Sequence, residues 1–336
     1  MGAAQAAPSS LPGAGPSDSP SAFFKTVPVQ PPPRPTDFVA LFALACAMLL
    51  WSGTFIAMKL ALVHFHPVFM VFLRMTASTL LLIPFMRAWA KRTPYSRGDW
   101  RIIGLLVLAE PCFYFMFEAY ALRYTTASQA GVITSLLPLL VGVTAYFVLK
   151  ERLGKKTWIG FFLAMAGVVA LTLSSEDSDA APNALFGNIL ELLAMLMACV
   201  YTLCVRKLRG YPPFFITAMQ AGAGMIFFGV LFLAMGAPLP ETLPPVLPGA
   251  PFDGTMLQRY TPYLAIAFLS FSTIVAYGLY NTGIARLSAG QAAAWINLIP
   301  AITLVMGIVM LDERLGLVQA LALIPIVIGV VLSQLR

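Results

Sequence analysis

Apolar blocks about 20 residues long follow one another from residue 38 to the end of this chain, and they constrain its fold more than any other feature. A helix of about 20 apolar residues matches the hydrocarbon core of a bilayer, which is about 30 Å thick. Apolar residues make up 59% of the sequence and charged residues only 10%, whereas about a quarter of a soluble domain is charged. Such a chain could not cover its surface in water. We therefore expect an integral membrane protein made of helices.

The apolar blocks predict ten transmembrane helices. Their approximate ranges are 38–62, 67–87, 101–122, 126–149, 156–174, 184–206, 213–235, 260–284, 289–310 and 316–335. The segment before them, residues 1–37, is rich in Pro, Ala, Gly and Ser. It cannot bury enough apolar surface to offset its ordering entropy, so we expect a disordered tail. A regulatory or partner-binding tail is the alternative to a passive one.

The positions of Lys and Arg predict how the helices are oriented. With a cytoplasmic N-terminus, most basic residues fall in the inside connections, and the outside ends hold only Arg123, Arg259 and Arg314. This asymmetry is the positive-inside pattern, and it places both termini in the cytoplasm. The net charge of +7 is thus explained by topology, and we expect no binding to nucleic acid.

The second half of the chain repeats the first at an offset of 162 residues. The matched residues are of rare types: Gln129 with Gln291, Pro138 with Pro300, Gly167 with Gly329, and Glu151-Arg152-Leu153-Gly154 with Glu313-Arg314-Leu315-Gly316. Because each half contains five spans, an odd number, the second half must insert upside down. Inverted repeats are common in secondary transporters, where the substrate site lies between the halves; bundles without transport activity can also arise by duplication.

The fold class expected is therefore an all-α membrane protein with two inverted five-helix repeats around a central cavity. The first repeat covers residues 38–174 and the second covers residues 183–336. We assign the Glu-Arg pairs at 151–152 and 313–314 to helix capping and to pairing between helices. Lys59, near the end of its helix, is expected to extend toward the membrane surface.

Several motifs resemble those of the EamA family, within the drug/metabolite transporter superfamily. They are Ala127-Ser128-Gln129-Ala130, the mid-span Pro138, the (Lys/Asp)-Glu-Arg-Leu-Gly corner of both halves, Trp51-Ser52-Gly53-Thr54-Phe55, and the spacing from Pro67 to Arg74. The similarity covers residues 38–336. It implies a ten-helix bundle with a central cavity and, usually, export of amino acids, metabolites or toxic compounds. It does not imply a particular substrate.

Four ionisable residues lie within the spans: Arg74, Glu110, Glu118 and Glu191. Such residues are costly in a membrane and point to function. Glu110 and Glu118 share a helix face with Tyr114, which lies four residues from each, so we expect this face to point into the bundle.

Two interpretations of these groups stay open. In the first, a carboxylate cycles a proton or binds a cationic group of a substrate. In the second, Arg74 pairs with Glu118 or Glu191 and only joins helices. Arg74 could also hold a substrate carboxylate, and Glu110, which precedes a proline, either belongs to the site or supports a kink.

Further polar and aromatic side chains could line a cavity in the second half. They are Tyr277, Tyr280, Asn281, Gln291, Trp295 and Asn297, with Gln129 from the first half. Taken singly, each could instead make a helix–helix hydrogen bond or pack as an aromatic ring. Pro138 and Pro300 should kink their helices at matching places, either as hinges or as static bends.

Together these features predict a secondary transporter that exports a small metabolite by alternating access, coupled to protons or to exchange, in the inner membrane of a bacterium. An amino acid or a related amine-bearing compound is the favoured substrate. An exchanger of phosphorylated solutes, such as sugar phosphates or nucleotide sugars, is the first alternative, and it would need several basic residues in the cavity. A membrane enzyme or a scaffold that does not transport is more distant.

The sequence predicts no catalytic residues, no metal site and no cofactor. His64 and His66 form a short pair that offers too few ligands for a metal, and no phosphate-binding loop is readable. The expected partners are a small-molecule substrate and the lipid bilayer. The oligomeric state stays open, with a monomer as one option.

Overall fold

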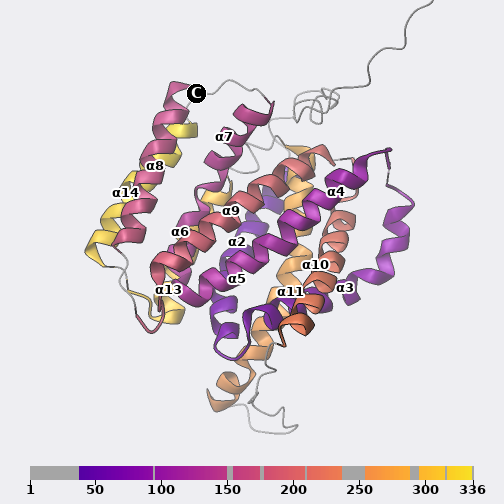
Figure 1. Ribbon diagram of the computed structural model, residues 1–336, viewed down its shortest axis with the longest axis horizontal. Helices are drawn as coiled ribbons and strands as arrows, with labels where there is room; N and C mark the ends of the chain where they lie inside the picture. Colours follow the sequence, from indigo (N-terminus) through magenta and orange to yellow (C-terminus); the bar gives the residue numbers. More distant parts are fainter. Residues whose placement is uncertain are drawn as a thin grey trace, which may run out of the picture.

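The computed structural model is a bundle of helices (Figure 1). It describes residues 38–93, 95–149, 154–174, 178–208, 210–236, 254–287, 295–314 and 316–334, and the predicted tail at 1–37 lies outside them. Eight helices are long and apolar enough to cross a membrane, and two shorter apolar stretches follow, Trp295–Leu311 and Leu317–Leu332. Within the described residues the regular elements are all helical. The chain thus has the all-helical fold of a membrane protein.

The helices follow the apolar segments of the sequence. Their bounds are α2 Phe38–Leu62, α3 Pro67–Ala90, α4 Asp99–Val107, η1 Leu108–Phe113, α5 Tyr114–Tyr124, α6 Ala127–Thr134, α7 Leu137–Leu149, α8 Lys155–Leu173, α9 Ala184–Lys207, α10 Pro213–Met235, α11 Gly254–Arg286, η2 Trp295–Asn297, α13 Leu298–Leu311 and α14 Leu317–Gln334. Two expectations need correction: the segments 101–122 and 126–149 are each divided into shorter helices. The first residues of the predicted segment 289–310 lie outside the described part.

The segment from Asp99 to Tyr124 is interrupted at Glu110. This residue has an extended backbone (φ −146°, ψ 117°) inside the wide turn η1, and the Glu110–Pro111 peptide bond is cis. Proline lacks the N–H that a continuous helix needs and its ring clashes with the preceding turn. The break therefore falls in the middle of the segment, at the proline where the sequence indicated that helix bonding would be disturbed.

The two matched prolines also follow breaks. Pro138 is the second residue of α7, directly after a turn at Ser135 and Leu136 that separates it from α6. Pro300 is the third residue of α13, directly after the single 3-10 turn η2. Both prolines thus follow interruptions of the helical structure, and these interruptions occur at corresponding places of the two halves.

Helices from the two halves pack against each other in pairs. The pairs are α8 with α14, α3 with α10, α6 with α13, α2 with α11, and α5 with α9. In Figure 1, α8 and α14 lie side by side at one edge of the bundle, and α3 and α10 lie toward the other. Every pair joins one helix from before residue 174 to one from after it, so the core is shared between the halves.

The contact between α8 and α14 is reciprocal. A Cβ placed on Gly167 would meet Ile326 and the carbonyl oxygen of Ala322, at 2.6 and 3.0 Å. A Cβ placed on Gly329 would meet the amide nitrogen of Ala164 and the carbonyl oxygen of Gly160, both at 2.5 Å. Each contact maps onto the other when 162 is added to the first-half residue numbers and subtracted from the second-half ones, because Gly160, Ala164 and Gly167 correspond to Ala322, Ile326 and Gly329. The two helices therefore approach closely only because both positions are glycine.

The connections that the sequence predicts on the side opposite the cytoplasm meet at one end of the bundle, here named the Ala180 end. The ammonium of Lys59 donates to the carbonyl oxygen of Ala180 at 2.6 Å. The carboxylate of Glu313 accepts from the backbone N–H groups of Ala127 and Ser128, at 2.7 and 2.9 Å. Glu313 thus caps the N-terminus of α6, which confirms the capping expected of this corner.

The opposite end, here named the Asp99 end, joins the connection after α9 to the start of α4. The hydroxyl of Tyr211 donates to Asp99 at 2.7 Å, and the backbone N–H of Ser96 donates to the same carboxylate oxygen at 2.9 Å. Burial and the bond to Asp99 raise the pKa of Tyr211 above its ordinary value. Tyr211 therefore stays protonated and able to donate at physiological pH.

Candidate functional site

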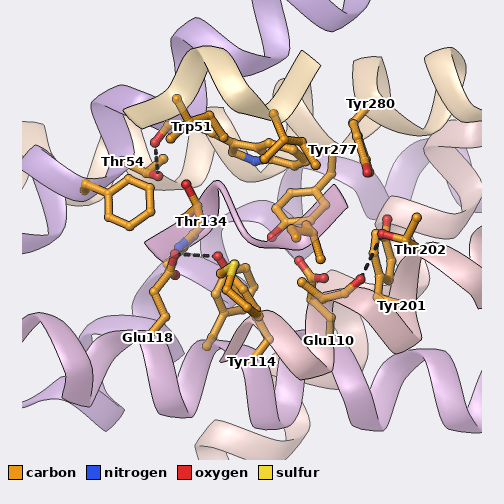
Figure 2. A pocket seen from close by; sticks show the side chains of 18 residues that line it. Trp51, Thr54, Glu110, Tyr114, Glu118, Thr134, Tyr201, Thr202, Tyr277 and Tyr280 are labelled. Carbon is orange, nitrogen blue, oxygen red and sulfur yellow. Dashed lines mark hydrogen bonds between the residues drawn. The ribbon is translucent and has the colours of Figure 1, made fainter. Parts of the chain in front are cut away.

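A cavity of about 50 Å³ lies between the two halves (Figure 2). Its walls come from helices on both sides of residue 174, as expected for a central site. The lining residues are Trp51, Thr54, Phe55, Arg74, Glu110, Tyr114, Phe115, Glu118, Thr134, Leu137, Met195, Ala198, Tyr201, Thr202, Tyr277, Tyr280, Ile296 and Ile299. The space has room for a few water molecules.

Glu110, Tyr114 and Glu118 all line this cavity, as their four-residue spacing predicts. The two carboxyl groups are only 3% exposed, so they are held inside the bundle. Tyr114 donates from its hydroxyl to Oε1 of Glu118 at 2.7 Å. The break at η1 places Glu110 at the middle of its segment, and Glu118 lies two turns nearer to the Ala180 end. Figure 2 shows these residues along one side of the cavity.

Arg74 enters the cavity from α3 and is 1% exposed. Its Nε donates to the hydroxyl of Thr273 at 2.6 Å, and a terminal nitrogen lies 3.8 Å from the sulfur of Met58. The guanidinium also stacks on Phe115, 4.2 Å from the ring centre. This is a cation–π contact, which stabilises a cation away from water.

The ion pair considered for Arg74 does not form in the described part of the chain. Glu118 receives its hydrogen bond from Tyr114, and both oxygens of Glu191 lack a partner there. The guanidinium is held by a hydroxyl, a sulfur and a ring instead of by a carboxylate. Arg74 and the carboxyl groups thus share the cavity without neutralising one another in direct contact.

Aromatic rings form the opposite wall of the cavity. The ring of Trp51 lies 5.1 Å from that of Tyr277 and 4.8 Å from that of Tyr280. Tyr277 is also 6.1 Å from Tyr201 and 6.0 Å from Phe115. The indole N–H of Trp51 has no hydrogen-bond partner among the described residues. Figure 2 shows Trp51, Tyr277 and Tyr280 across the cavity from the two glutamates.

Glu191 is not among the residues that line the cavity. It is 0% exposed and lies one helical turn before Met195 on α9. Met195, Ala198 and Thr202 follow at helical spacing and line the cavity. Glu191 therefore shares the cavity-facing side of α9, one turn closer to the Ala180 end.

Other predicted residues lie away from the cavity. Asn281 accepts from the hydroxyl of Tyr201 at 2.6 Å and donates to Thr217 at 3.2 Å, so it supports a lining residue from behind. Trp295 is half-buried, and its neighbours Ile296 and Ile299 provide the wall. Gln291 lies outside the described residues.

Gln129 belongs to a second polar cluster near the Ala180 end. Its amide oxygen accepts from Asn188 at 2.8 Å and lies 3.2 Å from the hydroxyl of Thr125, whose single O–H is nearer to the amide oxygen of Asn188, at 2.6 Å. Asn188 donates in addition to Thr172 at 3.3 Å. This cluster joins four helices, so Gln129 makes helix–helix hydrogen bonds rather than lining the cavity.

A wider hollow of about 340 Å³ opens at the Ala180 end. Its charged lining residues are Lys59, Arg123, Asp179 and Glu313. The positive charge of Arg123, after the larger effect of burial, lowers the pKa of nearby His66. No group of three or more His, Cys, Asp or Glu that could hold a metal occurs in the part of the chain that the structure describes.

Comparison with known proteins decides the family. The model of the EamA-like transporter family matches residues 38–173 and again residues 185–335. This chain belongs to the EamA-like transporter family. Its relatives include YetK of Bacillus subtilis, named as an uncharacterized transporter, which is 26% identical over 88% of this chain and 87% of its own length. YedA of Escherichia coli, named as an uncharacterized inner membrane transporter, is 26% identical over 89% and 90%.

A crystal structure supports the fold. It is similar to this EamA-like chain with a TM-score of 0.59 and 19% identity, and the alignment covers 89% of this chain and 97% of the other. At this identity the likeness concerns the fold alone. The EamA-like chain is therefore a multi-pass membrane protein, and its named relatives are transporters.

Sequence reasoning missed about half of the polar and aromatic wall of this EamA-like protein. Trp51 appeared only as part of a family motif, and Thr134, Tyr201 and Thr202 were not proposed as site residues. A signal was present on α9, where Glu191 precedes Met195, Ala198 and Thr202 on one helix face. Extending that face from the glutamate would have predicted the α9 wall.

Proposed function

We propose that this EamA-like protein is a secondary transporter that exports an amino acid or a related amine-bearing metabolite. The observation that carries the proposal is the cavity, in which two buried carboxyl groups face a wall of aromatic rings. Transport is by alternating access and is coupled to protons or to exchange. The proposed location is a bacterial inner membrane with both termini in the cytoplasm, in agreement with the distribution of basic residues and with the name of the relative in Escherichia coli.

The chemistry of the cavity suits an organic cation. Carboxylates attract an ammonium group, and the faces of Trp and Tyr rings stabilise cations within about 6 Å. Glu110 and Glu118 provide the first interaction, and Trp51, Tyr277 and Tyr280 provide the second. A few placed polar groups in a mostly apolar wall are typical of a small-ligand site. An amine with an apolar side chain would use both parts of this cavity.

Arg74 extends the match to amino acids. A guanidinium can bind a carboxylate through two parallel hydrogen bonds. Among the described residues, Thr273 accepts from the Nε of Arg74, and the sulfur of Met58 contacts one terminal nitrogen at 3.8 Å, a weak bond that a substrate carboxylate could replace. A zwitterion with its ammonium toward Glu110 and its carboxylate toward Arg74 would satisfy both charges. Arg74 is the only basic residue among the described lining residues, which disfavours substrates with multiply charged phosphate groups.

The architecture supports ten membrane-spanning helices in two inverted repeats. The reciprocal approach of Gly167 and Gly329 relates α8 to α14 by a two-fold operation. Another pair of contacts follows the same symmetry. In the proposed repeat α2 corresponds to α9 and α5 to α11, and α2 packs on α11 just as α9 packs on α5. The shorter helices α13 and α14 pack against α6 and α8 of the first half, respectively. We propose that α13 and α14 each span the membrane alongside these partners.

Movement is needed for transport, because a cavity of about 50 Å³ is smaller than an amino acid. Ligand sites of drug-like size usually have volumes of about 300 Å³ or more. We propose that the structure is a closed state, in which the cavity does not admit substrate. Bending at the breaks before Pro138 and Pro300 then opens the cavity. Corresponding hinges in inverted repeats allow one half to rock against the other.

The test is uptake by proteoliposomes that contain the purified chain. Labelled amino acids, amines without a carboxylate and sugar phosphates would be compared, with and without a pH gradient. We expect amino acids and amines to accumulate and sugar phosphates not to. Glu110→Gln should reduce amine transport strongly, whereas Asp179→Asn, which changes an exposed carboxylate outside the cavity, should not. Accumulation of sugar phosphates alone, or of no compound, would refute the proposal.

A further inference from the structure

Glu191 is a buried acidic residue without a hydrogen-bond partner. Its side chain is 0% exposed, and neither carboxyl oxygen has a donor among the described residues. It does not line the cavity, but it lies on the same face of α9 as Met195, Ala198 and Thr202, which do. The amine site described above therefore does not explain why this position is acidic.

The charged surroundings of Glu191 consist of few groups. Helix α5 packs along α9 and brings Glu118 and Tyr114 to face Glu191. Helices α4, α6, α7, α8 and α11 and the turn η1 also contact α9, and they place no further charged group against Glu191 in the described part of the chain. Arg74, which lines the cavity with Glu118, also acts on Glu118. Glu118 is thus the cavity-lining acid that interacts with Glu191.

An ionised carboxylate would be costly at this position. Burying a charge without a partner in an apolar interior costs several kcal/mol, and a protonated carboxyl avoids most of that cost. Two neighbouring carboxyl groups also resist being ionised together. No group in the described part of the chain donates to Glu191, which favours a proton on Glu191. Tyr114 donates to Glu118, which favours a charge on Glu118.

We propose that Glu191 and Glu118 form the proton-carrying site of this transporter, with Glu118 shared between this pair and the amine site that it lines together with Glu110. The assignment rests on the proposed function, since a proton site is needed only if transport is proton-coupled. In the transfer step, the O–H bond of Glu191 breaks and an O–H bond of Glu118 forms, so Glu191 becomes the carboxylate and Glu118 the acid. Glu118 then gives the proton to water in the cavity, and Glu191 takes a proton back from water that reaches it when the two halves rock apart.

The first test measures protonation without any substrate. Infrared difference spectra of the purified full chain would be recorded through a pH titration, and the carbonyl band of protonated carboxyl groups would be followed. We expect Glu191→Gln to remove one component of this band and Glu191→Asp to restore one. At neutral pH, where exposed carboxylates are ionised, Asp179→Asn should leave the band unchanged. A band that is the same in Glu191→Gln and in the wild type would overturn the assignment.

The second test separates coupling from substrate binding. In proteoliposomes, accumulation driven by a pH gradient is compared with exchange of labelled for unlabelled amine. For Glu191→Gln the ratio of driven accumulation to exchange should fall by about tenfold or more, an effect equivalent to about 1.4 kcal/mol. For Glu110→Gln both should fall together. An unchanged ratio in Glu191→Gln, or accumulation that follows a Na⁺ gradient at constant pH, would overturn the proton site.

The two tests also distinguish the failure of each proposal. If the wild type moves no amine but Glu191→Gln loses its infrared component, the proposed function fails and the proton site stands. If amine transport is found and the infrared band does not change, the function stands and the proton site falls. Should Glu191→Gln not fold, Glu191→Asp and Glu118→Gln allow the same comparison.

Discussion

Tyr114 donates a 2.7 Å hydrogen bond to Glu118 from one turn earlier on the same helix. The bond holds a buried carboxyl group that lines the cavity. It also makes the hydroxyl of Tyr114 the group that sets the direction of Glu118. A hydrogen bond to a charged group contributes about 1.5–3 kcal/mol.

Removing this hydroxyl should weaken substrate binding. Tyr114→Phe keeps the ring on the cavity wall and deletes the donor, so Glu118 is no longer held in place. We expect the apparent affinity for a transported amine to fall on the order of tenfold, about 1.4 kcal/mol. Competition binding with the purified protein measures the effect. Tyr120→Phe is the matched control, because its ring packs on His66 outside the cavity; equal losses in both variants would contradict the prediction.

Arg74→Lys should separate amino acids from simple amines. Lysine keeps the positive charge but loses the planar fork that bonds Thr273 and stacks on Phe115. We expect the affinity for amino acids to drop by about tenfold or more, since bonds to a charged carboxylate contribute about 1.5–3 kcal/mol. The affinity for the amine that lacks the carboxylate should change little. Measured dissociation constants for such a pair decide the matter, and parallel losses would show that Arg74 supports the bundle rather than the substrate.

The reciprocal glycines make a prediction about stability. Gly167→Ala and Gly329→Ala each introduce a Cβ within 3 Å of atoms on the facing helix, and overpacking of this kind costs about 1–3 kcal/mol. Thermal unfolding in detergent should show a lower midpoint for both. Gly104→Ala and Gly142→Ala place the same group in open space and should be neutral or stabilising, because alanine favours a helix by about 1 kcal/mol. Similar shifts at all four positions would argue against the close contact.

Glu313→Gln tests the cap on α6. The amide keeps the size of the side chain, but one of its two ends is a donor and cannot accept from a backbone N–H. With one of the bonds to Ala127 and Ser128 lost, stability should fall by about 1–2 kcal/mol, which thermal unfolding would detect. Asp312→Asn removes a neighbouring charge and keeps a residue type that tolerates the left-handed backbone found there, φ 52°. That variant should unfold like the wild type.

The sequence predicts the helical segments well because each apolar block is as long as a membrane is thick. It also predicts which side of α5 faces inward, since carboxyl groups at positions 110 and 118 cannot face lipid. The break at Glu110 was harder to place. Pro111 indicated that helix bonding would be disturbed, yet prolines at 84 and 325 lie inside continuous helices, so a proline alone does not determine a break.

The aromatic wall could not be predicted for a different reason. In a membrane, lipid-facing and core-facing side chains have the same chemistry: Phe38 and Phe42 are 77% and 72% exposed, whereas Leu44 and Met48 are fully buried on the same helix. Apolar periodicity therefore does not reveal the inner face. Only polar groups in the sequence reveal the inner face, and the single N–H of Trp51 is too weak a signal to do so.

The approach of Gly167 to Gly329 has a consequence for the origin of the chain. Its symmetry is that of an isologous interface, in which the same patch of two identical subunits meets itself. The α8–α14 contact is thus what a pair of single five-helix chains would form across a two-fold axis, here contained in one polypeptide. In such an ancestor one glycine codon would have determined both sides of the contact. In a single chain each side can mutate alone, and here both positions are glycine.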